Sequence, residues 1–257
     1  MANVIGELMK GKQGIVLGVA NKRSIAWAIA QTLASQGARL AITYQSERVE
    51  KYVRELAQEL QDPLILRCDV TKEDEIKALM ATVGSEFGSL DFIMHSVAYG
   101  DLDQPVLATS REAYLKALEI SAYSLVAVAG QATKLMSQGG SIATMTYYGS
   151  EKVVPGYNIM GVAKATLEAS VRYLAHDLGP RGVRVNAVSA GPLSTLAARS
   201  ISGFTQMRSI AAERAPLRRP VEVSEVANTA LFLLSDMASG ITGEVVYVDC
   251  GYHIMGM

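Results

Sequence analysis

Residues 14–26 read Gly-Ile-Val-Leu-Gly-Val-Ala-Asn-Lys-Arg-Ser-Ile-Ala, a short apolar run followed by a turn and the start of a longer helical stretch. The run at 14–18 is too short for a buried helix, so it predicts a buried strand. A helix that begins near Ser24 presents unpaired N–H groups and the positive end of its dipole to an anion over the turn, and a pyrophosphate meets that demand. Only Gly18 remains of the glycine pattern typical of such turns, so Ala20 and Ser24 must supply the close approach. Taken alone, the turn also fits an ordinary strand-to-helix connection with Ser24 as the N-cap.

The same alternation of a short apolar run and a longer helical stretch continues to the C-terminus. Strands are expected at residues 14–18, 40–43, 64–68, 92–95, 141–145, 183–188 and 244–248, and helices at 24–36, 47–60, 72–87, 111–136, 157–178 and 224–234. Apolar strands separated by helices predict an α/β fold, a Rossmann-like doubly wound sheet of seven parallel strands with helices on both faces. In such sheets a ligand binds at the carboxyl ends of the strands, beside the topological switch point.

Composition limits the classes of function. The 257 residues are 49% hydrophobic, and 24 Lys and Arg against 25 Asp and Glu give a net charge of −1, so no overall field attracts nucleic acid or an anionic membrane. The chain contains no apolar run of about 18 residues and no secretory signal, which predicts a cytoplasmic protein. Cys68 and Cys250 match neither a metal-ligand nor a redox spacing, so no metal site is expected. Without a linker or repeat, residues 1–257 are expected to form a single dinucleotide-binding and catalytic domain.

The ends of the second and third strands carry the residues that would select a dinucleotide. Gln45 follows the second strand, where an acidic residue would bind the adenosine ribose hydroxyls and a basic pair would attract a 2′-phosphate. Arg48 and Lys51 come next, on a helix where such charges are commonly solvated, so the pattern favours NADH over NADPH. Asp69 closes the third strand, where a carboxylate accepts the adenine amino group, caps the helix beginning near Lys72, or does both.

The strongest chemical pattern follows the fifth strand. Residues 146–149 read Thr-Tyr-Tyr-Gly, and residues 155–164 read Pro-Gly-Tyr-Asn-Ile-Met-Gly-Val-Ala-Lys. Tyr157 and Lys164 are seven residues apart, so on one α-helix their side chains would leave the same face about 10 Å apart. A tyrosine hydroxyl donates a hydrogen bond to a developing oxyanion, and a nearby ammonium favours that charge. A core tyrosine beside a lysine with a buried stem is the alternative, but the position after the fifth strand and next to Tyr147 favours catalysis.

Residues 18–27, 95–99, 120–124, 157–164, 183–192 and 243–249 together carry a family resemblance. The chain resembles the short-chain dehydrogenase/reductase superfamily and, within it, the NADH-dependent bacterial enoyl-acyl carrier protein reductases of type II fatty acid synthesis. The resemblance extends over essentially the whole chain. Ketone-reducing members typically carry Tyr-x-x-x-Lys, whereas six residues separate Tyr157 from Lys164, as in the enoyl reductases.

The resemblance implies a role for each matching residue. Tyr157 would stabilise the enolate formed when hydride reaches the β-carbon of an enoyl thioester, Lys164 would hold the nicotinamide ribose, and Tyr147 is the second catalytic tyrosine. Cofactor contacts are implied for Gly18, Ser24, Ile25, Gln45, Asp69, Val70, Val97, Lys164, Leu193, Ser194, Thr195, Leu196 and Ala197. Substrate contacts are implied for Tyr99, Gly100, Tyr147 and Tyr157.

The resemblance also implies NADH as the cofactor, an enoyl-acyl carrier protein as the substrate, and a homotetramer in which the apolar residues 252–257 are buried at a subunit contact. One position departs from the family. Many members have Ile-Arg-Thr or Val-Lys-Thr after Gly-Pro, whereas this chain has Leu193-Ser194-Thr195. A cationic contact near the cofactor phosphates is therefore expected to be missing.

Three further expectations concern the rest of the site. Residues 193–212, rich in Ala, Ser, Ile and Met, predict a mobile lid over the acyl chain, with an ordinary pair of surface helices as the alternative. His95 has no acidic partner near it in sequence and is expected to be packed rather than to act as a base. An alcohol dehydrogenase or 3-oxoacyl reductase is disfavoured by the Tyr–Lys spacing and Tyr147. A non-catalytic dinucleotide-binding regulator is disfavoured by the presence of Tyr147, Tyr157 and Lys164 together.

Overall fold

The computed structural model describes residues 7–195, 198 and 203–256, and these contain one sheet of seven parallel strands. The strands are β1 (Gln13–Leu17), β2 (Arg39–Tyr44), β3 (Leu64–Arg67), β4 (Phe92–His95), β5 (Gly140–Thr146), β6 (Val183–Ala190) and β7 (Val245–Val248). Their order in the sheet is β3-β2-β1-β4-β5-β6-β7, and each neighbouring pair is parallel. The predicted Rossmann-like sheet is confirmed, with its switch point between β1 and β4.

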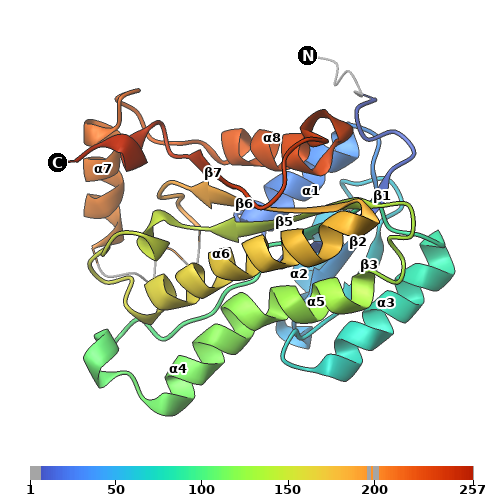
Figure 1. Ribbon diagram of the computed structural model, residues 1–257, viewed down its shortest axis with the longest axis horizontal. Helices are drawn as coiled ribbons and strands as arrows, with labels where there is room; N and C mark the ends of the chain where they lie inside the picture. Colours follow the sequence, from blue (N-terminus) through green and yellow to red (C-terminus); the bar gives the residue numbers. More distant parts are fainter. Residues whose placement is uncertain (1–6, 196–197, 199–202, 257) are drawn as a thin grey trace.

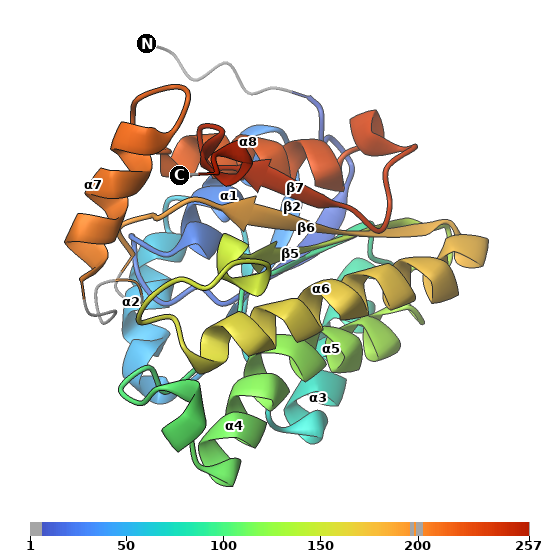
Figure 2. The same cartoon turned by 60° about the vertical axis from the view of Figure 1, so that its left-hand side comes forward.

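Helices cover both faces of the sheet because the strands are apolar on both sides. Val16 packs with α1 (Ile25–Ser35), α2 (Glu47–Ala57) and α8 (Val223–Leu234), whereas its neighbours Ile15 and Leu17 pack with α3 (Glu73–Phe87), α5 (Ser124–Ala132) and α6 (Ile159–Leu178). Two further helices, α4 (Arg111–Leu118) and α7 (Phe204–Arg214), lie beyond the carboxyl ends of the strands (Figures 1 and 2). The carboxyl edge is therefore the edge over which additional structure is built.

Two helices differ from the expectation. The helix expected at 111–136 is interrupted by a π-helical turn, Glu119–Tyr123, which separates α4 from α5. The helix expected at 157–178 begins only at Ile159, because Asn158 adopts φ 43° and ψ −125°. Few L-residues adopt a positive φ, and here the Asn158 side chain donates a hydrogen bond to the carbonyl of Leu102 at 2.8 Å. Tyr157 thus precedes the helix, and the prediction that it shares a helical face with Lys164 is wrong.

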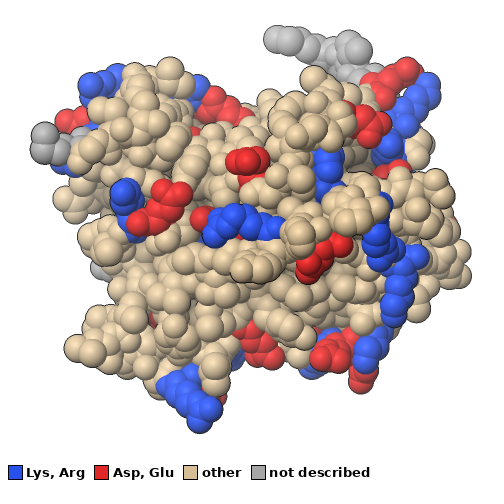
Figure 3. Space-filling view, in the orientation of Figure 1, with Lys and Arg blue, Asp and Glu red and all other residues tan. Residues whose placement is uncertain are grey.

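The surface shows no concentration of one charge on the face seen in Figure 3, where basic and acidic side chains lie among uncharged residues. Over the described ranges, no helix is both long and apolar enough to cross a membrane.

Candidate active site

Two tyrosines meet at the carboxyl end of β5. Tyr147 directly follows the strand and Tyr157 lies two residues before the first residue of α6, and their rings pack edge to face with centroids 4.9 Å apart. Gly149 makes room for this arrangement, since a Cβ there would lie 2.5 Å from the Tyr157 ring. The Tyr147 hydroxyl contacts the sulfur of Met207 at 3.3 Å, so α7 covers the pair.

Both phenols are held in their protonated form. Burial, followed by the nearby Tyr147 and Glu168, raises the pKa of Tyr157 well above the ordinary tyrosine value. Burial is also the main cause that raises the pKa of Tyr147 to about 12. Near neutral pH each hydroxyl is therefore a hydrogen-bond donor, the state required to stabilise a developing oxyanion.

Lys164 places a buried ammonium group against the end of β5. Its residue is 5% exposed, and its Nζ donates a hydrogen bond to the carbonyl of Met145 at 2.8 Å. Burial lowers the pKa of Lys164 to about 8, while the Glu168 carboxylate opposes that shift. An ammonium carries three donors, and among the described residues one of them is used, so two remain for the hydroxyl groups of a ligand.

The first strand–turn–helix unit has the geometry of an anion site. Gly18 has φ 96°, and a Cβ there would lie 2.1 Å from the carbonyl oxygen of Ser96, so only glycine allows β1 to end this close to the β4 end. Ser24 occupies the N-cap position but makes no side-chain cap, because its Oγ accepts hydrogen bonds from the N–H groups of Ala20 and Asn21. The first turn of α1 carries no acidic residue, so no carboxylate competes for the helix start; the N–H of Trp27 donates to the Ser24 carbonyl at 3.1 Å, and that of Ile25 is placed to receive an anion. These residues fit a dinucleotide pyrophosphate.

The positions expected to select the adenosine lie at the ends of β2 and β3. Gln45 is exposed directly after β2, and Lys51 pairs with Glu55 on the surface at 4.0 Å. Asp69 accepts hydrogen bonds from the N–H and hydroxyl of Thr71 at 3.1 and 2.8 Å. The N-cap of α3 is Lys72, so the alternative role of Asp69 as that cap is wrong. Val70 is buried beside Asp69.

The segment after β4 is held by Ser121, a residue that the sequence did not identify as part of the site. Tyr99 exchanges two hydrogen bonds with the Ser121 hydroxyl: its N–H donates at 2.9 Å and its carbonyl accepts at 2.8 Å. Val97 packs against the core below, and a Cβ on Gly100 would lie 2.5 Å from the sulfur of Met160. Ser121 belongs to the π-helical turn, which therefore positions the expected substrate segment.

His95 is packed, as expected. Its two ring nitrogens lie 3.0 Å from the Thr144 hydroxyl and 2.8 Å from that of Ser124, and burial lowers its pKa to about 3. It is therefore neutral near neutral pH. In the described part of the chain, no group of three or more His, Cys, Asp or Glu side chains is placed to hold a metal ion.

The segment after β6 is described only in part. Leu193 is buried, Ser194 is exposed, and Thr195 accepts a hydrogen bond from the N–H of Ala198 at 3.0 Å. The expected contacts at Leu196 and Ala197, and part of the expected lid at 193–212, lie outside the described residues. A groove of about 500 Å³ is lined by Ser194, Phe204, Thr205, Arg208, Ser209, Ala212 and Pro220.

Sequence reasoning gave no role to three residues of this site. Ser121 acts through a π-helical turn, and Met207 reaches Tyr147 from a distant helix, so neither carries a local signal. Glu168 lies four residues after Lys164 on α6, and that i,i+4 spacing is a signal that would have found it.

Comparison with known proteins gives the same family across the chain. Residues 18–253 match the family described as enoyl-(acyl carrier protein) reductase. An enoyl-[acyl-carrier-protein] reductase [NADH] of Rhizobium meliloti is 52% identical over 260 residues, covering 100% of this chain and 95% of that protein. The solved Bacillus cereus enoyl-acyl carrier protein reductase with NADP⁺ and an indole naphthyridinone is 52% identical, with a TM-score of 0.96 over 98% of this chain and 100% of the other. The Anaplasma phagocytophilum reductase in complex with NAD is 48% identical, with a TM-score of 0.95 over 98% and 97% of the two chains. The chain belongs to the enoyl-(acyl carrier protein) reductase family.

Proposed function

We propose that the protein is an NADH-dependent enoyl-[acyl-carrier-protein] reductase. It adds hydride to the β-carbon of a trans-2-enoyl thioester, the last reductive step of fatty acid elongation. The observation that carries this proposal is the buried cluster of Tyr147, Tyr157 and Lys164 at the carboxyl end of β5. Two relatives named for this activity are each 52% identical to the chain over nearly its whole length, and this supports the proposal.

The cofactor would extend along the carboxyl edge of the sheet. The turn from Gly18 through Ser24 to Ile25 would hold the phosphates at the start of α1. Gln45 would contact the adenosine ribose, and Asp69 and Val70 the adenine. Val97 would lie by the nicotinamide ribose, whose hydroxyls would accept the two remaining Lys164 donors. Leu193, Ser194 and Thr195 would lie over the nicotinamide.

When bound, NADH supplies the hydride, and the residues of the chain manage the charge that results. Hydride addition at the β-carbon moves negative charge to the thioester oxygen, because the double bond and the carbonyl are conjugated. Tyr157, protonated and buried, donates a hydrogen bond to that oxygen where few water molecules compete. Tyr147 packs on Tyr157 and fixes its ring, and its own hydroxyl faces α7, where the acyl chain would enter.

The proposed substrate cover includes α7. Its buried residues Phe204 and Ala211 and its contact through Met207 place an apolar helix face over the tyrosines. Tyr99 and Gly100 would line the opposite side, where Ser121 holds the chain. An apolar cover of this kind suits an acyl chain and excludes water from the enolate.

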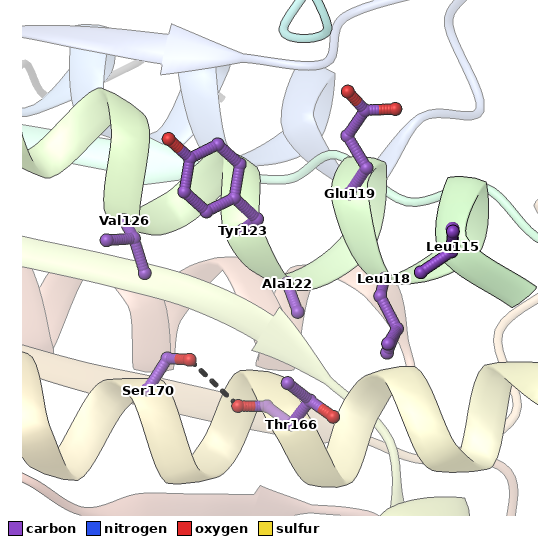
Figure 4. Close-up of a pocket in the computed structure, with 8 residues that line it drawn as sticks. All are labelled: Leu115, Leu118, Glu119, Ala122, Tyr123, Val126, Thr166 and Ser170. Carbon is purple, nitrogen blue, oxygen red and sulfur yellow. Dashed lines mark hydrogen bonds between the residues drawn. The ribbon is translucent and has the colours of Figure 1, made fainter.

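We further propose that the protein assembles as a homotetramer in the cytoplasm. A groove of about 500 Å³ lies between the α4–α5 region and α6, lined by Leu115, Leu118, Glu119, Ala122, Tyr123, Val126, Thr166 and Ser170 (Figure 4). Leu115 and Tyr123 are each 52% exposed, and Ile254 near the C-terminus is 68% exposed, which are apolar surfaces a partner subunit would cover. Light scattering in solution should give a mass four times that of one chain, and a monomeric mass would refute the assembly.

The test of the reaction is an absorbance assay of NADH and NADPH oxidation with crotonyl and longer enoyl thioesters. The proposal expects NADH oxidation that depends on the enoyl thioester. Faster turnover of simple alcohols or 3-oxoacyl thioesters would overturn the proposed reaction in favour of the ketone-reducing alternative.

A further inference from the structure

Two buried charged side chains of α6 form hydrogen bonds with consecutive residues at the end of β5. The Lys164 ammonium donates a hydrogen bond to the Met145 carbonyl at 2.8 Å, and the Thr146 hydroxyl donates one to Glu168 Oε1 at 2.5 Å. Lys164 and Glu168 are 5% and 6% exposed and lie one helical turn apart. The next residue of the chain after this doubly held pair is Tyr147.

A carboxylate is an unfavourable choice for this helix face unless it has a task. The neighbouring positions of the same face, Leu167 and Val171, are apolar and fully buried, and an apolar side chain at 168 would pack against β5 without the cost of desolvating a charge. Glu168 instead has a hydroxyl donor and lies beside a buried ammonium. Removing its charge would take away a carboxylate that lies one helical turn from that ammonium and opposes the lowering of its pKa by burial.

We propose that Glu168 is a positioning residue of the reductase, whose carboxylate keeps Lys164 charged and, through Thr146, fixes the end of β5 that carries Tyr147. This inference rests on the proposed function, because Lys164 needs its charge to hold the cofactor ribose. Glu168 acts through Lys164 and Thr146 and touches neither substrate nor cofactor itself.

The other titratable groups around this pair do not change charge near neutral pH. His95 on β4 has its pKa lowered to about 3 by burial, and burial raises the pKa values of Tyr157 and of Tyr247 on β7. Burial lowers the pKa of Lys164 to about 8, and Glu168 is the group that opposes this shift. A change in cofactor affinity between pH 6 and 9 therefore reports on Lys164.

The experiment is a fluorescence titration of NADH against pH with the wild type and Glu168→Gln, which keeps the shape and removes the charge. In the wild type, NADH affinity should fall as the pH rises through about 8. Without the carboxylate the midpoint should move down by about one pH unit. The Kd would then be unchanged at pH 6 and about fivefold higher than wild type at pH 8, because about half of Lys164 is charged in one protein and about a tenth in the other.

Three further variants separate this role from a general loss of packing. Asp177→Asn removes an exposed carboxylate from the same helix and should leave the midpoint unchanged. Glu168→Asp keeps the charge one methylene further away and should move the midpoint by less than Glu168→Gln; it also serves if the glutamine variant does not fold. Thr146→Val removes the hydroxyl and should lower kcat severalfold with little change in the NADH Kd at pH 6.

An unchanged midpoint in both Glu168 variants overturns the inference. A Kd raised equally at every pH does so too, since it would indicate a structural role alone. The readout uses only NADH, so it is independent of the reaction. If the wild type binds NADH but reduces no enoyl thioester, the proposed function fails while the titration still decides the role of Glu168.

Discussion

The two ends of the proposed cofactor site are built differently. At the β5–α6 end, Tyr157 and Lys164 are buried and each has defined partners. At the β2–β3 end, Gln45 is exposed after its strand and Asp69 is engaged in a local turn with Thr71. A polar contact is strong where water is excluded and weak where it is screened. The chemistry is therefore expected to be sensitive to single atoms, and adenosine selection to be tolerant.

Tyr157→Phe should produce the largest effect, because it removes one hydroxyl from the buried end and keeps the ring packed on Tyr147. The loss of one oxyanion donor costs about 10²–10³ in kcat, with about tenfold as the lower limit if water or ribose hydroxyls take over. Steady-state kinetics with an enoyl thioester measures the fall, and the NADH Kd should barely change. Full activity in this variant would show that the buried end is not the catalytic end.

Lys164→Ala should separate binding from chemistry at the same end. It removes a charged donor and leaves the Glu168 carboxylate without its neighbouring cation, so the NADH Kd should rise by about 10- to 100-fold. A fluorescence titration measures this directly. A thermal-unfolding measurement should accompany the titration, because a loss of folded protein would also raise the apparent NADH Kd. A folded variant with unchanged Kd would contradict the assigned ribose contact.

Tyr147→Phe tests whether the two tyrosines differ. Its hydroxyl contacts Met207 of α7, so the change should alter kcat or the KM for the acyl substrate while the NADH Kd stays within about twofold. A loss of cofactor affinity as large as that of Lys164→Ala would place this residue in the cofactor site instead.

Substitutions at the exposed β2–β3 end should change the kinetics less than those at the buried end. Wild-type kcat/KM should be higher with NADH than with NADPH, because Gln45 offers no cation for a 2′-phosphate. Gln45→Arg should raise kcat/KM for NADPH by only about two- to fivefold, since exposed ion pairs contribute about 1 kcal/mol or less. A wild-type preference for NADPH above about tenfold would contradict the comparison and assign the 2′-phosphate to Arg48 or Lys51.

The smallest expected effect is a change in the hydrogen-exchange protection of α7 without a change in the fold. Two residues of α7, Phe204 and Ala211, are buried, whereas β5 and β6 are buried along most of their length. Hydrogen exchange should be faster in α7 than in the sheet without ligand, and slower once NADH and an acyl ligand are bound. Equal protection of α7 in both states would refute a lid.

The sheet was predictable because apolar strands and helices alternate from Gly14 to Val248, and a covered parallel sheet leaves few other topologies. The placement of Tyr147 and Lys164 at the end of β5 was predictable because a strand end and the following helix bring them to one edge of the sheet. The start of α6 was not, because the positive φ of Asn158 depends on a tertiary bond to Leu102. The π-helical turn was not either, because its sequence Glu119–Tyr123 reads as an ordinary helix while Ser121 makes contacts distant in sequence.

The fate of a deuterium label tests the proposed reaction most directly. The wild type is given NADH deuterated on the transferring face of the nicotinamide ring together with a trans-2-butenoyl thioester, and the product is examined by mass spectrometry and NMR. The expected product is a saturated thioester with one deuterium on the β-carbon. The contradicting result is an unreduced enoyl thioester, while a 3-oxoacyl thioester given to the same enzyme acquires the label at its carbinol carbon.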